Sequence, residues 1–221
     1  NGGRSFELFE ARWPDPQAGG QACGVGWLRD GTLLAATCEQ DNGPVSRTLF
    51  SRGVRNASCS AQACKIGPTS ALPVACCGGW SWDPLLAEIP PIKANWSTGG
   101  DLSIRFVEDD EDGSIYYITG NANRDDAHET LERAVLYAST DRGRSFAPRG
   151  SMLEWSSESD VLPLGGGRLL AVTRYQTRNC SDAPTLAAKD IGRATGPHYQ
   201  GTAVLFSGDR GYTWQTRGMV T

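Results

Sequence analysis

The stretches "STDRGRSF" (Ser139–Phe146) and "SGDRGYTW" (Ser207–Trp214) decide the fold of this chain. Both follow the pattern Ser-x-Asp-x-Gly-x-Ser/Thr-aromatic. In such a turn the Asp side chain accepts backbone N–H groups, the Gly supplies a positive φ without steric cost, and the aromatic residue packs against the sheet. The pattern therefore predicts β-hairpins. The residues that carry it are Ser139, Asp141, Gly143 and Phe146 in the first turn and Ser207, Asp209, Gly211 and Trp214 in the second.

Three longer stretches share one layout of strand, tight turn and strand: "GVGWLRDGTLLAAT" (24–37), "IRFVEDDEDGSIYYIT" (104–119) and "DVLPLGGGRLLAVT" (160–173). Their turns are anchored by Gly31, Gly113 and Gly167. A third apolar strand follows each of them, at 46–51, 133–139 and 202–208. The chain is thus divided into repeat A (7–58), an insertion rich in Cys, Pro and Trp (59–100), repeat B (101–150) and repeat C (151–221).

The first six residues, "NGGRSF" (1–6), form a partial copy of the same turn, with Asn1 where the other copies have Asp. They are expected to end a preceding repeat. Repeat A has lost the turn, because Gly53 stands where the Asp is expected.

The two complete turns resemble the Asp boxes, or BNR repeats, of sialidases and related β-propellers. Such propellers consist of four-stranded antiparallel blades arranged around a central channel. The resemblance predicts an all-β fold with three blades of a six-bladed sialidase-like propeller. Three blades do not close a ring, so the remaining blades are expected to come from the same longer chain or from another chain. The Asp box itself is structural and indicates architecture.

Only repeat C carries a charged pair within its first hairpin. Aligned on the turn glycines, Glu158 begins the first strand and Arg174 ends the second, whereas the equivalent positions in A and B are uncharged. An antiparallel hairpin places both residues at the end away from its turn and on one face. A lone buried charge there would be costly, so the two side chains either pair or meet a charged ligand.

The segment "SESDVLPLGGGRLLAVTR" (157–174) also resembles the part of the sialidase family in which a Glu begins one strand and an Arg ends the next. The resemblance implies that Glu158 is catalytic and polarises a Tyr nucleophile, and that Arg174 binds the substrate carboxylate as the middle Arg of three. A neutral Tyr suits a sialoside, whose own carboxylate repels a carboxylate nucleophile. The family's first Arg is not found in repeat A; "ARWP" (11–14) is a weak alternative for it.

Together these features predict a fragment of a secreted or cell-surface glycoside hydrolase acting on terminal sialic acid or a similar acidic sugar, inactive by itself. The alternative is a non-catalytic Asp-box propeller that binds a glycan or protein, or serves as a structural module, with Glu158 and Arg174 as a simple cross-strand ion pair. No cofactor is implied. Arg193 and Tyr199, in a long loop with His198, are candidate substrate contacts, against the alternative of an ordinary surface loop.

Four further expectations concern single features of the repeats. Asp160 is expected to cap a strand end, with a second polar group of the site as the alternative. The acidic run 108–113 is expected to be a solvated hairpin tip, with a calcium site as the alternative. Trp27 and Trp214 are expected to pack within the blades rather than to bind sugar.

Composition restricts the class of protein. The net charge is −4 and no Lys/Arg cluster stands out, which argues against nucleic acid as a partner. No apolar run approaches the roughly 18 residues of a membrane span. Three Asn-X-Ser sequons and seven cysteines instead indicate the secretory pathway. The sequons begin at Asn56, Asn95 and Asn179.

The cysteines favour disulfides. Cys23 and Cys38 lie symmetrically about the turn signal Asp30-Gly31, so antiparallel pairing is expected to set them side by side. Zinc is the alternative for the remaining cluster, but the chain has no Cys-x-x-Cys pair and only two His. The cluster, whose connectivity the sequence leaves open, consists of Cys59, Cys64, Cys76 and Cys77, with Cys180 left over.

Overall fold

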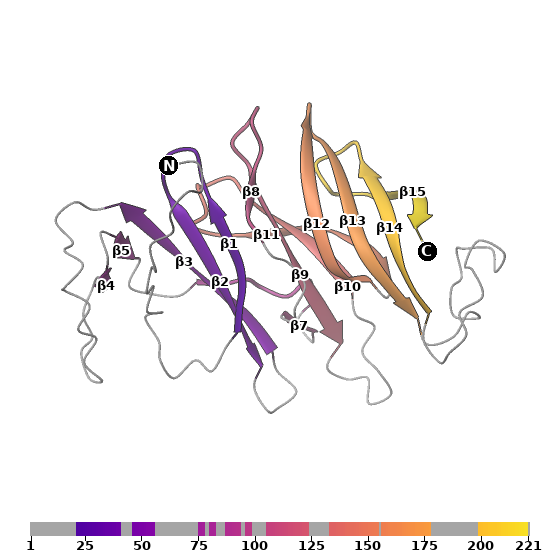
Figure 1. The fold of residues 1–221 in the computed structure, drawn as a ribbon, viewed down its shortest axis with the longest axis horizontal. Coiled ribbons are helices and arrows are strands. Elements are labelled where there is room, and N and C mark those ends of the chain that lie inside the picture. The colour runs from indigo at the N-terminus through magenta and orange to yellow at the C-terminus, as the bar shows by residue number, and fades with distance from the viewer. Residues whose placement is uncertain are drawn as a thin grey trace, which may run out of the picture.

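The computed structural model describes residues 21–40, 46–55, 75–77, 80–82, 87–93, 96–98, 105–123, 133–154, 156–177 and 199–220. These residues form three antiparallel β-sheets that stand side by side along the long axis of the molecule (Figure 1). Among them, no helix has the length and apolar character to cross a membrane. The all-β architecture of antiparallel sheets predicted from the repeats is confirmed.

The first sheet contains the strands of repeat A. β1 (Gln21–Trp27), β2 (Leu33–Gln40) and β3 (Ser46–Arg55) form a meander, and the sheet continues through β5 (Trp80–Trp82) to β4 (Ala75–Cys77). β6 (Ala87–Glu88) pairs with another part of β3. The segment 59–100, expected as an insertion, therefore supplies outer strands of this sheet.

The second sheet has the order β11-β10-β9-β7, with β8 also paired to β9. Its strands are β7 (Trp96–Thr98), β8 (Val107–Glu108), β9 (Ile115–Asn123), β10 (Arg133–Ser139) and β11 (Ala147–Glu154). The third sheet is an uninterrupted four-stranded meander. It contains β12 (Ser156–Gly165), β13 (Arg168–Thr177), β14 (Tyr199–Ser207) and β15 (Gln215–Val220).

Two apolar clusters join the three sheets. Between the first and second sheets, the Phe146 ring meets Phe50 edge to face at 5.0 Å, and Phe106 stacks on Tyr117 at 4.3 Å. Between the second and third sheets, buried side chains of β9, β10, β13 and β14 form a second cluster, which includes Tyr116, Leu136, Leu169 and Leu205. The sheets therefore face one another with their apolar sides, as stacked blades require.

The two Asp turns have the geometry that their sequence predicts. In the first, the Asp141 carboxylate accepts hydrogen bonds from the backbone N–H groups of Arg144 and Ser145, both at 3.0 Å. The Ser139 hydroxyl accepts the N–H of Gly143 at 2.8 Å. In the second turn Asp209 accepts the N–H of Thr213 and Ser207 accepts the N–H of Gly211, whereas the N–H of Tyr212 donates to the carbonyl oxygen of Asp209. Gly143 and Gly211 have φ angles of +73° and +84°. The turn glycines Gly31, Gly113 and Gly167 also have positive φ.

Phe146 is buried as predicted, and Trp214 packs against the second apolar cluster. Trp27 does not pack as expected, because 61% of it is exposed on the face of the first sheet that points away from the second.

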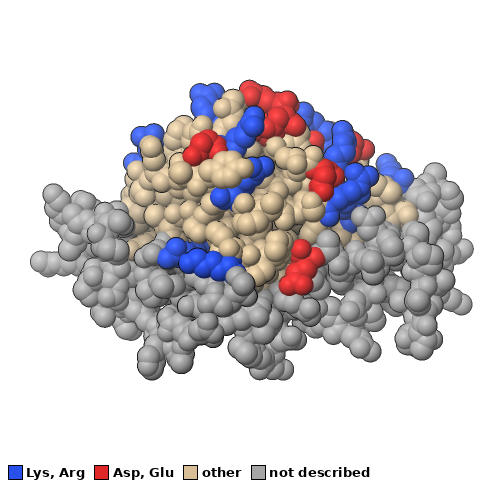
Figure 2. All heavy atoms as spheres, turned by 180° about the vertical axis from the view of Figure 1, so that it is seen from behind, with Lys and Arg blue, Asp and Glu red and all other residues tan. Residues whose placement is uncertain are grey.

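The acidic hairpin tip 108–113 is more than a solvated tip. The Arg29 guanidinium donates to the carbonyl oxygen of Asp109 at 2.6 Å and pairs with the Asp110 carboxylate at 2.7 Å. On the other side, Glu111 accepts the N–H of Gly166. The tip of the second sheet thus contacts the tips of both neighbours, along one edge where acidic side chains gather among basic ones (Figure 2).

Candidate functional site

The candidate site is built on β12, the strand of the third sheet that lies next to the second sheet. Its side chains alternate: Ser159 and Val161 are buried, whereas Glu158 is exposed and Asp160 half-buried. This alternation follows from the period of a strand, in which successive side chains point to opposite faces. Glu158 and Asp160 therefore share one face, two residues apart.

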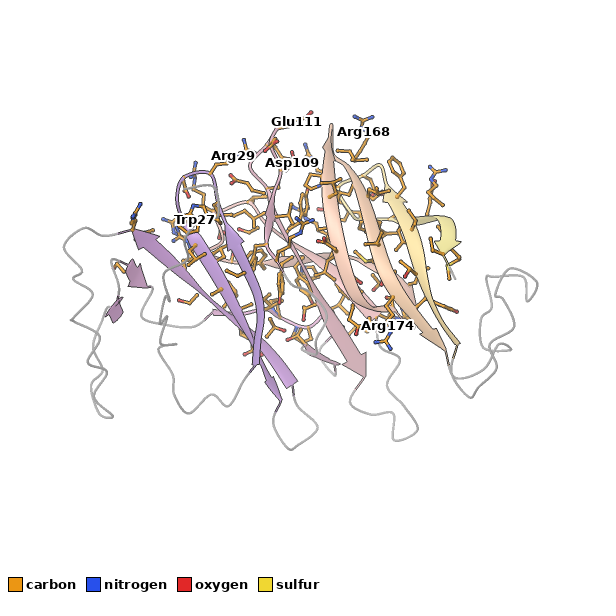
Figure 3. All side chains as sticks on the ribbon, in the orientation of Figure 1. Trp27, Arg29, Asp109, Glu111, Arg168 and Arg174 are labelled. Atoms are coloured by element: carbon orange, nitrogen blue, oxygen red, sulfur yellow. The ribbon has the colours of Figure 1, made fainter. Side chains whose placement is uncertain are left out.

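Arg174 of β13 pairs with Glu158, as the sequence predicts. Its Nη1 atom donates to both carboxylate oxygens at 2.7 Å. The register places Ser159 opposite Thr173, with an irregularity between Ser156 and Ser159. Figure 3 shows Arg174 at the opposite end of the molecule from the hairpin tips, where Arg29, Glu111 and Arg168 lie. The prediction that the pair lies away from the turn is confirmed.

The charge state of Glu158 limits the role it can play. Partial burial raises its pKa, but the hydrogen bond and positive charge of Arg174 outweigh this, helped by the Ser157 hydroxyl at 3.2 Å, so the pKa lies below its usual value. A general acid needs a raised pKa, because it must hold a proton near neutral pH. Glu158 is therefore charged and not suited to donate a proton, and its carboxylate can orient or polarise a neighbouring hydrogen-bond donor.

Asp160 has a partner that sequence reasoning missed. The expected strand-end cap is wrong, because Asp160 lies within β12 and is paired with Val172. Its carboxylate accepts the N–H of Val161 at 2.9 Å and also receives a two-pronged pair from Arg105. Nε and Nη2 of Arg105 lie 2.8 Å from the two carboxylate oxygens. Arg105 belongs to the second sheet's repeat and bridges to Val25 of the first. The sequence holds both residues, but the juxtaposition depends on how neighbouring sheets align.

Hydroxyl groups support the strand from its buried side. The Ser159 hydroxyl donates to Thr173 Oγ1 at 2.7 Å, which ties β12 to β13 beside the Glu158–Arg174 pair. Ser156 donates to the carbonyl oxygen of Leu153 at 2.5 Å and accepts the N–H of Ala134 at 2.9 Å. These bonds satisfy buried polar groups and fix the start of β12 against β10.

The remaining predicted site residues are not brought together by the described structure. Arg193, His198 and the sequon residues Asn56, Asn95 and Asn179 lie outside the described residues, as do Cys59, Cys64 and Cys180. Tyr199 begins β14, and Cys76 and Cys77 belong to β4, but their side chains are not described. Their proposed roles stay predictions.

The expected register of Cys23 and Cys38 is wrong. Cys38 lies opposite Gln21, and Cys23 falls in a bulge between the pairs formed by Ala22 and Gly24. A bulge inserts an extra residue and shifts the pairing, which symmetry about the turn does not anticipate. The disulfide itself stays a prediction, because the side chains of both cysteines lie outside the described set.

No group of three or more His, Cys, Asp or Glu side chains arranged to hold a metal ion occurs among the described residues. Within the acidic tip, Asp109 and Asp112 use carboxylate oxygens to accept the N–H groups of Glu111 and Ser114, both at 2.8 Å. Their role in the described structure is to shape the hairpin.

No protein family and no curated protein matches the chain. Several solved structures are similar to the chain in fold. A Hadza microbial sialidase is similar with a TM-score of 0.53 and 16% identity, over 88% of this chain and 32% of its own. A mutant of Trypanosoma rangeli sialidase displaying trans-sialidase activity is similar with a TM-score of 0.52 and 16% identity, over 92% of this chain and 29% of its own. An α-L-arabinofuranosidase from Fusarium graminearum has a TM-score of 0.53 and 13% identity, over 91% of this chain and 50% of its own.

The similarity concerns the fold, since the identities are low. The chain has the fold of part of a β-propeller and spans between 29% and 50% of the length of these structures. Fold alone does not give the reaction, which has to be argued from the site.

Proposed function

We propose that the chain is the part of a glycoside hydrolase that supplies Glu158 and Arg174 to its active site, and that the complete enzyme removes terminal sialic acid or a similar acidic sugar from glycans. The observation that carries the proposal is the Glu158–Arg174 pair at 2.7 Å, at the end of β12 away from the tips. Both side chains are partly exposed, Glu158 to 48% and Arg174 to 36%.

The chemistry of the pair fits an acidic sugar. Among the described residues, Arg174 donates to Glu158 through Nη1 alone, which leaves Nη2 for a ligand carboxylate. A guanidinium binds carboxylates through parallel N–H groups. Glu158, kept charged by Arg174, would accept the proton of a Tyr nucleophile from a blade outside this chain, as in sialidases. This segment would then contribute Arg174, which orients the substrate carboxylate, and Glu158, which accepts the proton.

The other candidate function is a propeller that binds glycan or protein without catalysis. The exposed ion pair is compatible with it, since cross-strand pairs occur as surface features of many sheets. The proposal also includes the Asp-box character of the turns and a location in the secretory pathway. The three sequons support that location. A mobility shift on treatment with an N-glycosidase would test it.

The decisive experiment measures hydrolysis of an aryl α-sialoside and of an aryl α-arabinofuranoside by the complete protein. We expect activity on the sialoside, and a loss of about 100-fold or more in kcat/KM with Glu158→Gln. Arg174→Gln should raise KM strongly. Arg168→Gln, at the other end of the same strand, is the matched control and should leave both constants unchanged. Activity on the arabinofuranoside alone would reject the acidic sugar, and no hydrolysis of either would favour the binding module.

A further inference from the structure

We propose that Arg105 and Asp160 form a positioning pair, contributed by two different sheets, which keeps Arg174 bound to Glu158 and so prepared for substrate. The inference rests on the proposed roles of Glu158 and Arg174. Neither Arg105 nor Asp160 is expected to touch the substrate. Their effect is to decide which carboxylate Arg174 binds.

The first step is that two carboxylates compete for Arg174. Glu158 and Asp160 lie on the same face of β12, about 7 Å apart along the strand. The register pairs Asp160 with Val172, so Arg174, two residues further along β13, is a diagonal neighbour of Asp160. Glu158 lies in the irregularity between Ser156 and Ser159 and is held by the Nη1 atom of Arg174. Diagonal neighbours in an antiparallel pair are within reach of long side chains. Arg174 can therefore reach either carboxylate by rotating its side chain.

The second step is that Arg105 removes this competition. It donates to both oxygens of Asp160 at 2.8 Å, in the forked geometry that makes Arg–carboxylate pairs strong. With Asp160 satisfied, Arg174 directs Nη1 to both oxygens of Glu158. If Arg105 were lost, Asp160 would lose its two-pronged partner, and its carboxylate would compete with that of Glu158 for the single guanidinium of Arg174.

The third step is that the pair crosses from one sheet to the next. Arg105 precedes β8 in the second repeat, and Asp160 lies in the third sheet. The side chains are 46% and 32% exposed, so the pair is screened by solvent and contributes little to global stability. The pair is therefore expected to affect the position of Arg174 more than the free energy of unfolding. A positioning role can be distinguished from a structural one on this basis.

The experiment compares Arg105→Gln, Asp160→Asn and the double variant in the complete protein by crystallography and by kinetics on the aryl α-sialoside. In Arg105→Gln we expect Arg174 to leave Glu158 and bind Asp160, with KM raised about tenfold or more. In the double variant we expect Arg174 to return to Glu158 and KM to recover, because the competing carboxylate is gone. Asp160→Asn alone should resemble the wild type.

Arg142→Gln is the matched control, because it removes another ion pair between sheets, that with Asp30 at the tip edge, and should leave KM unchanged. An Arg174 that stays on Glu158 in the Arg105→Gln crystal structure would overturn the inference, whatever the kinetics. The inference would also be overturned if KM did not recover in the double variant. If the wild type cleaves no sialoside, the proposed function fails, and the position of Arg174 in the variants still decides the inference.

Discussion

At the scale of single residues, each Asp turn depends on one carboxylate that serves as the hydrogen-bond acceptor for the whole turn. Asp141 accepts from Arg144, Ser145 and Ser139, including a hydroxyl bond of 2.6 Å from Ser145. Slight burial raises its pKa, but the bonds from Ser145, Ser139 and Arg144 prevail and lower the pKa from 3.8 to about 2. The folded turn thus favours the charged Asp.

The replacement Asp141→Asn should lower the free energy of unfolding by about 1–2 kcal/mol at pH 7, since charge-assisted bonds are lost. The folded pKa is depressed, so the contribution of Asp141 is complete above its usual pKa of 3.8 and is lost as pH falls toward 2. Denaturant unfolding from pH 7 to pH 2 should therefore show the difference between wild type and variant shrinking below about pH 4. Glu88→Gln, an exposed carboxylate, is the control. A difference that does not change with pH would contradict this account.

The glycine of the second turn is a further residue-scale constraint. Gly211 has φ +84°, and a Cβ there would lie 2.2 Å from Leu136 Cδ2 of the neighbouring sheet. Gly211→Ala should therefore cost about 2–4 kcal/mol, from backbone strain and overpacking together. Gly218→Ala is the matched control, since its Cβ would meet no atom within 4 Å. Equal midpoints of chemical denaturation for the two variants would show that the turn tolerates a side chain.

At the scale of elements, the hairpin tips act as connectors between sheets. Arg29, in the turn that follows β1, reaches Asp109 and Asp110 across the gap, and its own N–H donates to Glu108 at 2.8 Å. The Arg142–Asp30 pair adds a second link between the same two sheets. The partners of the acidic run could not be found from the sequence, because Arg29 and Gly166 lie 80 and 55 residues from the residues that they contact.

Arg29→Gln should lower the free energy of unfolding by about 1 kcal/mol, since several exposed contacts form a network rather than one isolated pair. The loss should shrink in 1 M salt, where charges at such distances are screened. Arg217→Gln, on the outer strand β15, serves as the control for loss of an exposed Arg. An equal effect at low and high salt would show that the contact is not electrostatic.

At the scale of the whole molecule, three sheets stack with apolar faces between them, and the outermost faces stay exposed. The first sheet exposes Val25 and Trp27, and the third exposes Leu162, Leu164 and Val172. These faces match the apolar sides that neighbouring sheets bury elsewhere in the chain. The arrangement is that of a partial propeller, in line with structures of which this chain spans at most half.

The sequence by itself determined the central strands, the positive-φ glycines, the Asp turns and the Glu158–Arg174 pair. Each depends on local chemistry or on pairing within one hairpin, where separation along the chain fixes geometry. Even so, the bulge at Cys23 displaced the expected register, because a local count cannot detect an extra residue in a strand.

Only the tertiary structure decided how the sheets meet. It joined Arg105 to Asp160 across 55 residues, placed the acidic tip between two neighbours, and left Trp27 exposed. The position of β4 and β5 at the outer edge of the first sheet was also known only from the structure. The physical reason is that contacts between sheets depend on their relative shift and twist, which are set by packing of whole apolar faces and not by any short stretch of sequence.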